Sequence, residues 1–205
     1  MTNKQANRKQ SRKSVRATVN SILLDRAEHK YRTETHATAT TSTAAGISHA
    51  LSRPIVEGDE VDQRSGRQIR HIGSELRFSV NLPSAAISGV FRYIWVIDRL
   101  NNGVDVAVTD VLESASVTSG YNTNALISKR FIILKDVSQS MVVASTTQHV
   151  TPVITTRRSY NIHFSGATNV AASNGVGAQF LITITDLGLN APIYSLECLT
   201  HYLDM

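Results

Sequence analysis

The 205-residue sequence predicts an all-β fold of the sandwich or jelly-roll type, preceded by a basic N-terminal arm. Three observations lead to this prediction. Seven or eight short segments have the composition or alternation of β-strands. Loop signals containing Gly or Asn separate them. No helical patterns of about 10–15 residues alternate with the strands, which argues against a parallel α/β fold.

Each predicted element rests on its own pattern. In residues 72–80 the even positions are mostly apolar and the odd positions mostly polar, which is the period of a half-buried strand. Residues 91–97 (FRYIWVI) are dense in aromatic and β-branched side chains and predict a buried strand. A short helix is predicted near 109–115, where Asp110 and Glu113 complement the helix dipole. Further strands are predicted at 131–137, 141–144, 160–164, 180–185 and 193–200.

The charge is distributed very unevenly along the chain. Residues 1–33 carry nine Lys or Arg and two acidic residues, so this arm has a charge of about +7. The rest of the chain carries twelve Lys or Arg and fourteen acidic residues, a charge of about −2. A basic tail on a near-neutral domain is typical of a segment that binds a polyanion.

The N-terminal third divides into three parts. Val15, Val19, Ile22 and Leu23 have the spacing of one helical face, which predicts an amphipathic helix at about 15–30 within the arm. That helix either packs on the body or becomes ordered on nucleic acid. Residues 34–52 are rich in Thr, Ala and Ser, so we expect a linker or a loosely held edge strand. The folded body is expected at 53–205.

Composition excludes several classes of protein. One cysteine, Cys198, excludes an internal disulfide framework and a cysteine-rich zinc site. No apolar run is long enough to span a membrane, and no apolar segment of a secretory signal follows the first basic residues. A basic, Ser-containing N-terminus is also compatible with an organelle transit peptide.

The sequence lacks the usual catalytic motifs, so we expect a binding or structural protein and no enzyme. It contains no nucleophile elbow, P-loop, H-E-x-x-H or G-x-G-x-x-G motif, and 175–177 (GVG) alone predicts a loop. Cys198 and His201 could form a catalytic pair or half a metal site, but a buried thiol is the commoner situation. The acidic segment 57–62 is either a solvated loop or a site for a hard cation such as calcium.

Several separate strings then show a resemblance that extends over essentially the whole chain. They are 57–68 (EGDEVDQRSGRQ), 91–95 (FRYIW), 129–137 (KRFIILKDV), 165–180 (SGATNVAASNGVGAQF), Arg12-Lys13-Ser14, and Glu28-His29-Lys30 as the end of the helix. In content, order and spacing they resemble the coat proteins of satellite tobacco necrosis viruses. The resemblance implies an eight-stranded antiparallel jelly-roll sandwich without catalytic activity. It also implies a T=1 icosahedral shell of 60 copies in the virion, with the arms on single-stranded RNA.

The same resemblance implies RNA-binding residues and calcium ligands. The expected RNA contacts are Arg8, Lys9, Arg12, Lys13 and Arg16 in the arm and Arg70 and Lys129 on the inner surface of the body. One calcium ion is expected between subunits, on backbone oxygens of Ser65 and Gln68, the carboxylate of Asp204 and Glu28 of a neighbour. A second is expected on the threefold axis, held by Asp59, and a third on the fivefold axis near Ala144.

Other functions remain open from the residues alone. The main alternative is a monomeric nucleic-acid-binding β-domain of cellular origin, which sedimentation would distinguish from a particle. A capsid for single-stranded DNA is closer in kind, because phosphate contacts do not distinguish RNA from DNA. An enzyme on a β-scaffold is the third alternative.

Overall fold

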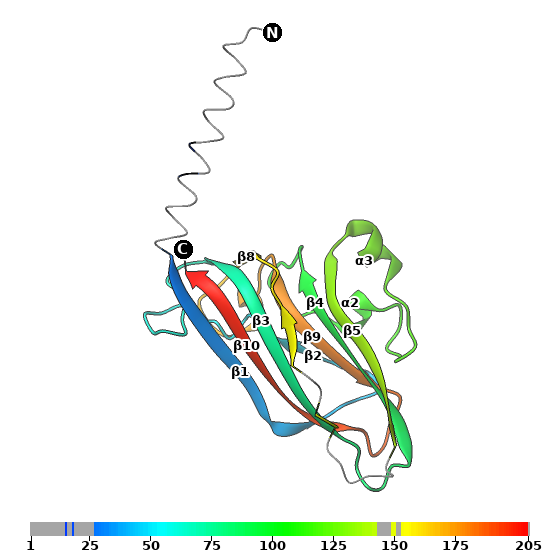
Figure 1. The fold of residues 1–205 in the computed structure, drawn as a ribbon. Helices are drawn as coiled ribbons and strands as arrows, with labels where there is room; N and C mark the ends of the chain where they lie inside the picture. The colour runs from blue at the N-terminus through cyan, green and yellow to red at the C-terminus, as the bar shows by residue number, and fades with distance from the viewer. Residues whose placement is uncertain (1–14, 16–17, 19–26, 143–148, 151–152, 205) are drawn as a thin grey trace.

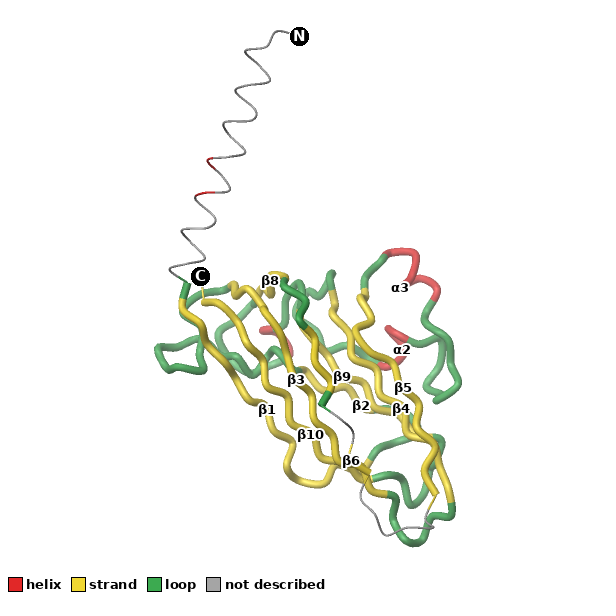
Figure 2. The backbone as a smooth tube through the Cα atoms, viewed as in Figure 1, coloured by secondary structure: helices red, strands yellow, loops and turns green. Residues whose placement is uncertain are grey.

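The computed structural model describes residues 15, 18, 27–142, 149–150 and 153–204, and the described body is a sandwich of two antiparallel sheets (Figure 1). Almost all of its regular structure is strand (Figure 2). The first sheet contains β1 (Glu28–Thr41), β10 (Ile193–Asp204), β3 (Gln68–Asn81), β6 (His149–Val150), β7 (Ile154–Thr156) and β8 (Tyr160–His163). The second contains β2 (Ile47–Ala50), β9 (Ala178–Thr185), β4 (Ser88–Asp98) and β5 (Phe131–Val142).

The strand order confirms the predicted eight-stranded jelly roll. The short strands β6, β7 and β8 all pair with β3, so together they fill one strand position of the first sheet. The two sheets then read β1-β10-β3-(β6–β8) and β2-β9-β4-β5. Each sheet therefore has four strand positions, and the chain passes between the sheets in the manner of a double Greek key.

The central strands β4 and β9 of the second sheet are buried on both faces, which explains why 91–97 is so apolar. Phe91, Tyr93 and Trp95 point into the core between the sheets, where they meet Phe78 and Leu196 of the first sheet. The alternate residues of β4 and β9 belong to a second apolar cluster, which includes residues of the covering segment 106–121. That segment contains α2 (Val108–Val111), and α3 (Thr123–Ser128) follows it.

The structure corrects the prediction for the N-terminal third. Glu28, His29 and Lys30 lie in β1 rather than in a helix, and 34–52, expected as a linker or a loosely held edge strand, contains most of β1 and all of β2, which are the edge strands of their sheets. Thr is β-branched and favours strands, and β1 gains eleven residue pairs with β10, so tertiary pairing decides the conformation. Val15 and Thr18 are helical, and the other residues of 15–26 lie outside the described part of the chain.

The remaining elements follow the sequence with smaller differences. The expected strands 131–137 and 141–144 join in β5, whose described part ends at Val142. The predicted helix 109–115 is the shorter α2, and α3 was not predicted. A 3-10 turn, η1 (Ala171–Ser173), precedes the 175–177 loop. None of the helices in the described ranges is long and apolar enough to cross a membrane.

The glycines of 175–177 allow the two sheets to approach at one end of the sandwich. Gly177 has φ of +89°, and a Cβ there would lie 2.5 Å from the carbonyl oxygen of Asn161 in β8. A Cβ on Gly175 would lie 2.3 Å from the carbonyl oxygen of His163. The Gly177 N–H donates to the carbonyl of Asp98 at the end of β4. The GVG segment thus connects β8 of one sheet to β4 of the other.

We expect Gly177→Ala to lower the free energy of unfolding by about 1–3 kcal/mol, because it adds both a positive-φ penalty and a contact with Asn161. Gly120→Ala is the matched control, since a Cβ there meets nothing within 4 Å and should change stability by at most about 0.5 kcal/mol. Urea unfolding of the full chain measures both. Equal stability of the two variants would contradict a tight sheet-to-sheet approach at Gly177.

Candidate functional site

The acidic segment 57–62 is part of a loop that one buried arginine organises. Arg64 is 1% exposed, and its guanidinium lies 4.1 Å from the centre of the Phe164 ring. It donates to the carbonyls of Ile55, Gly66 and Gly166 and pairs with the Glu57 carboxylate at 3.2 Å. Burial lowers the pKa of Arg64, and the Glu57 carboxylate opposes that effect. The guanidinium thereby fixes the loop that carries both Asp59 and Ser65.

Ser65, Glu28 and Asp204 meet at the end of the first sheet. Glu28 and Asp204 are direct partners in the β1–β10 register. The ammonium of Lys30, only 6% exposed, lies 3.2 Å from Asp204 Oδ2 and 3.3 Å from Glu28 Oε2. The Ser65 N–H donates to the same Asp204 Oδ2 at 2.8 Å. Burial lowers the pKa of Lys30, but the two carboxylates outweigh it and leave the pKa raised.

This cluster fits part of a calcium site. Asp204 Oδ1 is buried and has no hydrogen-bond partner among the described residues, so one carboxylate oxygen is available to a cation. Two carboxylates share one ammonium, which leaves the cluster with a net negative charge. Gln68 lies next to it, because its neighbour Ile69 is the β3 partner of Asp204. Calcium takes six to eight oxygens. No group of three His, Cys, Asp or Glu in the described ranges is placed to hold a metal ion.

The other expected calcium ligands lie apart from this cluster. Asp59 is exposed and, within the described residues, makes no hydrogen bond or ion pair. Its neighbour Asp62 instead pairs with Arg32 of β1. Ala144 lies outside the described residues. The structure therefore brings Ser65, Gln68, Asp204 and Glu28 together and leaves Asp59 exposed on its own.

Of the expected RNA contacts, Arg70 and Lys129 are described. Lys129 is exposed and ends α3 with a left-handed backbone, φ 53°. Arg70 lies in β3, and its Nε donates to Ser159 Oγ at 3.0 Å. Arg8, Lys9, Arg12, Lys13 and Arg16 lie outside the described residues.

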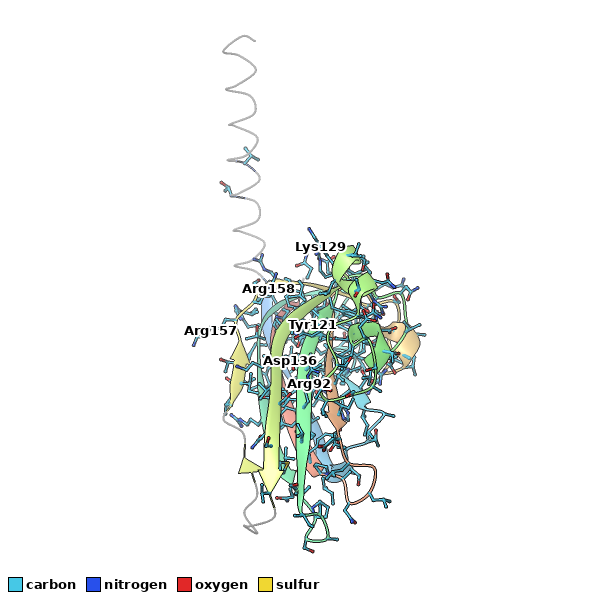
Figure 3. The ribbon with its side chains drawn as sticks, turned by 90° about the vertical axis from the view of Figure 1, so that its right-hand side faces the viewer. Arg92, Tyr121, Lys129, Asp136, Arg157 and Arg158 are labelled. Atoms are coloured by element: carbon cyan, nitrogen blue, oxygen red, sulfur yellow. The ribbon has the colours of Figure 1, made fainter. Side chains whose placement is uncertain are left out.

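Sequence reasoning missed three exposed arginines near Arg70 and Lys129. They are Arg99, Arg157 and Arg158. Lys129, Arg158 and Arg157 gather toward the upper end of the body in Figure 3, above Asp136 and Arg92. Two consecutive arginines, Arg157 and Arg158, just before the strand predicted at 160–164 could have indicated a basic surface. The sequence alone does not place them near Arg70, because that proximity depends on the pairing of β8 with β3.

A buried histidine fixes the backbone at Arg158. His71 is fully buried, with Nδ1 2.8 Å from the Arg158 carbonyl oxygen and Nε2 2.7 Å from Ser74 Oγ. Its ring also lies 4.8 Å from that of Tyr160. Burial lowers the pKa of His71 to about 4. The imidazole is therefore neutral near pH 7, and its Nδ1–H donates to the Arg158 carbonyl.

The Cys198–His201 pair has no catalytic geometry. Cys198 is 1% exposed in the core between the sheets, whereas His201 is exposed three residues later on the same strand. Burial raises the pKa of the Cys198 thiol to about 12. A thiol in this environment is not ionised near neutral pH and is not a nucleophile.

Comparison with known proteins identifies relatives along the whole chain. The family model of the satellite tobacco necrosis virus coat protein matches residues 1–205. The coat protein of Satellite tobacco necrosis virus 2 is 38% identical over 209 residues, covering 100% of both chains. The capsid protein of Satellite tobacco necrosis virus 1 is 36% identical, covering 89% of this chain and 90% of its own. The coat protein of Maize white line mosaic Satellite virus is 33% identical, covering 89% and 84%.

We expect the free energy of unfolding to fall by about 2–3 kcal/mol, through protonation of His71 alone, as the pH falls from about 6.5 to about 4.5. The folded-state pKa lies below the unfolded value, so the unfolded chain binds the extra proton and stability declines with acidity. Urea unfolding across this pH range measures the effect. His71→Gln should remove that part of the pH dependence, whereas His163→Gln, at an exposed position of β8, should retain it. An unchanged pH dependence in His71→Gln would contradict the assignment.

Proposed function

This chain belongs to the family of satellite tobacco necrosis virus coat proteins, and we propose that 60 copies of it close into a T=1 shell around single-stranded RNA. As a coat protein it is a component of the virus particle and not an enzyme. The observation that carries the proposal is the separation of a strongly basic arm from a near-neutral jelly roll. A monomeric cellular domain, the alternative from the residues alone, does not fit this family.

The arm is suited to bind the packaged strand. Residues 1–27, which precede β1, carry seven basic residues and one acidic residue, so 60 copies would place about 360 positive charges inside the shell. Contacts between cations and phosphates release counterions, which makes binding strong at low salt and independent of sequence. β1 begins at the same end of the sandwich as α3 and β8 (Figure 1), so the arm joins the body at that end. We assign Arg8, Lys9, Arg12, Lys13 and Arg16 to phosphate contacts, with Arg70 and Lys129 on the body.

The body has apolar surface that suits contacts between subunits. Several large hydrophobic side chains are exposed in the isolated chain, chiefly Ile87 (85%), Leu189 (84%), Ile127 (75%) and Val61 (68%). They lie on loops and on α3 rather than in the sheets. Exposed apolar side chains on a folded domain favour self-association, because assembly removes them from water.

Calcium would strengthen the contacts between subunits. Backbone oxygens of Ser65 and Gln68, the free Oδ1 of Asp204 and a Glu28 carboxylate would hold one ion, with a neighbouring subunit completing the shell of oxygens. Asp59 carboxylates from three subunits would hold a second ion on the threefold axis. Three carboxylates around one axis repel each other unless a cation or protons neutralise them.

Deletion of residues 1–14 should abolish RNA packaging and leave the β-body folded, because the deleted segment carries five basic residues and no acidic ones. Absorbance of purified particles measures the RNA content, and circular dichroism measures the fold. Replacing those five basic residues by Gln keeps the length and should have the same effect. If the truncated chain still packages RNA, the arm is not the segment that binds the packaged RNA.

Chelation with EDTA at about pH 8 should expand the particles and slow their sedimentation, because the carboxylates then repel each other across subunit contacts. Asp204→Asn should expand them without a chelator. Asp105→Asn is the control, since Asp105 pairs with Arg53 away from the proposed site. Compact particles after prolonged chelation would exclude a structural role for calcium.

A further inference from the structure

A depression opens between the two sheets at the end of the sandwich where β8, β4 and β5 meet. Its volume is about 470 Å³. The second sheet contributes Ile97 and Ile132, with Arg99 directly after β4, and the first sheet contributes Tyr160 and Asn161, with Arg158 just before β8. Ser159, Val176 and Gly177 complete the lining. We call this depression the Arg99–Arg158 pocket.

The pocket carries positive charge without a balancing acid. Neither Asp nor Glu lines it, and both of its arginines are exposed. Within the described residues, no carboxylate pairs with Arg99 or Arg158. Arg53, Arg64, Arg92 and Arg130, by contrast, each pair with an acidic side chain. The body thus leaves two guanidinium groups at the pocket available to an external anion.

The backbone around the pocket is fixed on every side. The Arg99 N–H donates to the Arg130 carbonyl at 2.8 Å, joining the end of β4 to the start of β5. Asp98, fully buried, accepts from Arg130 Nη2 at 2.9 Å and from Asn101 Nδ2 at 3.2 Å. Its backbone carbonyl accepts from Gly177. On the opposite side His71 fixes the Arg158 carbonyl. The pocket is therefore organised before a ligand arrives, which lowers the entropic cost of binding.

The remaining lining suits a nucleotide. The partly exposed Ile132 and Val176 provide apolar surface for a base, and the exposed Asn161 and Ser159 provide neutral hydrogen-bonding groups beside it. A guanidinium binds phosphate through two parallel N–H groups and also stacks on a base. Tyr160 has a structural role instead, because its hydroxyl accepts from Gln179 Nε2 at 2.6 Å.

We propose that the Arg99–Arg158 pocket binds one nucleotide of the packaged RNA, with its phosphate on Arg99 and Arg158 and its base against the apolar lining. The pocket would extend the basic surface of Arg70, Arg157 and Lys129 into a recess between the sheets. This inference rests on the proposed function, because it requires that the coat encloses single-stranded RNA.

The first experiment is photo-crosslinking in particles reassembled from the full chain and RNA that contains 4-thiouridine. We expect crosslinks on peptides that contain 97–99 or 158–161, in addition to crosslinks on the arm. The double variant R99Q/R158Q should lose the pocket crosslinks and keep those on the arm. The control R77Q/K135Q removes the same number of charges elsewhere on the body and should keep both sets.

The second experiment measures binding of an oligouridine of about ten nucleotides to the full chain at several salt concentrations. Removing two phosphate contacts on a single strand should reduce the slope of log K against log[salt] by about 1.4. R99Q/R158Q should show this reduction, whereas R99K/R158K and R77Q/K135Q should keep the original slope. If R99K/R158K keeps the original salt slope, the lower slope of R99Q/R158Q results from its lost charges and not from a change in folding.

The outcomes separate this inference from the proposed function. Packaged RNA with crosslinks only on the arm, or an unchanged salt slope in R99Q/R158Q, would overturn the pocket and leave the coat function intact. Wild-type particles that contain no RNA would overturn both. A folded R99Q/R158Q variant, shown by an unchanged melting temperature, is required for either comparison.

Discussion

The rest of the structure depends on the burial of β4 and β9 on both faces. An antiparallel sheet usually exposes one face to water, but every residue of β9 is buried. The first sheet covers one face, and the segment 106–121 covers the other.

An ion pair holds the segment 106–121 against the second sheet. The buried Arg92 binds Asp136 through two hydrogen bonds, of 2.9 and 2.7 Å, and donates to the carbonyls of Val117 and Ser119. Tyr121 also donates to Asp136 at 2.6 Å. Burial opposes ionisation of Asp136, yet these two partners lower its pKa.

The second sheet holds the charged side chains at one end of the sandwich in defined positions. Structural cations such as Arg64, Arg92 and Arg130 are paired, so they contribute little to the outer field. Among the described residues, exposed cations without a carboxylate partner, such as Lys129, Arg157 and Arg158, lie near α3 and β8, whereas Glu28 and Asp204 lie at the ends of β1 and β10. The net charge of about −2 for the body hides this separation. One end of the domain can therefore offer carboxylates to a metal and guanidinium groups to phosphate without each neutralising the other.

Strands were predicted well from the sequence where burial makes their residues apolar. They were predicted less well where the strand depends on hydrogen bonding to a neighbouring strand. Residues 91–97 are apolar because both faces are covered, and the strand was predicted correctly. Residues 28–41 have no comparable apolar pattern, so the strand depends on β10 beside it; 28–30 were mistaken for a helix end, and 34–41 were predicted only as a linker or an edge strand. The meeting of Ser65, Gln68 and Asp204 came from family resemblance, because no local pattern joins positions so far apart. The Arg99–Arg158 pocket could not be predicted, since Arg99 follows β4 of one sheet and Arg158 precedes β8 of the other.

Two physically different ways of binding a polyanion then coexist in one chain. A highly charged arm that becomes ordered on its ligand loses conformational entropy for each contact that it gains. A pocket fixed by Asp98, His71 and Gly177 has already lost that entropy during folding. In the proposed function the arm would supply most of the electrostatic free energy, and the pocket would add a contact at a defined position on each subunit. Because the symmetry of the proposed shell would repeat that position, a few rigid contacts per subunit would be enough to order segments of RNA against the protein.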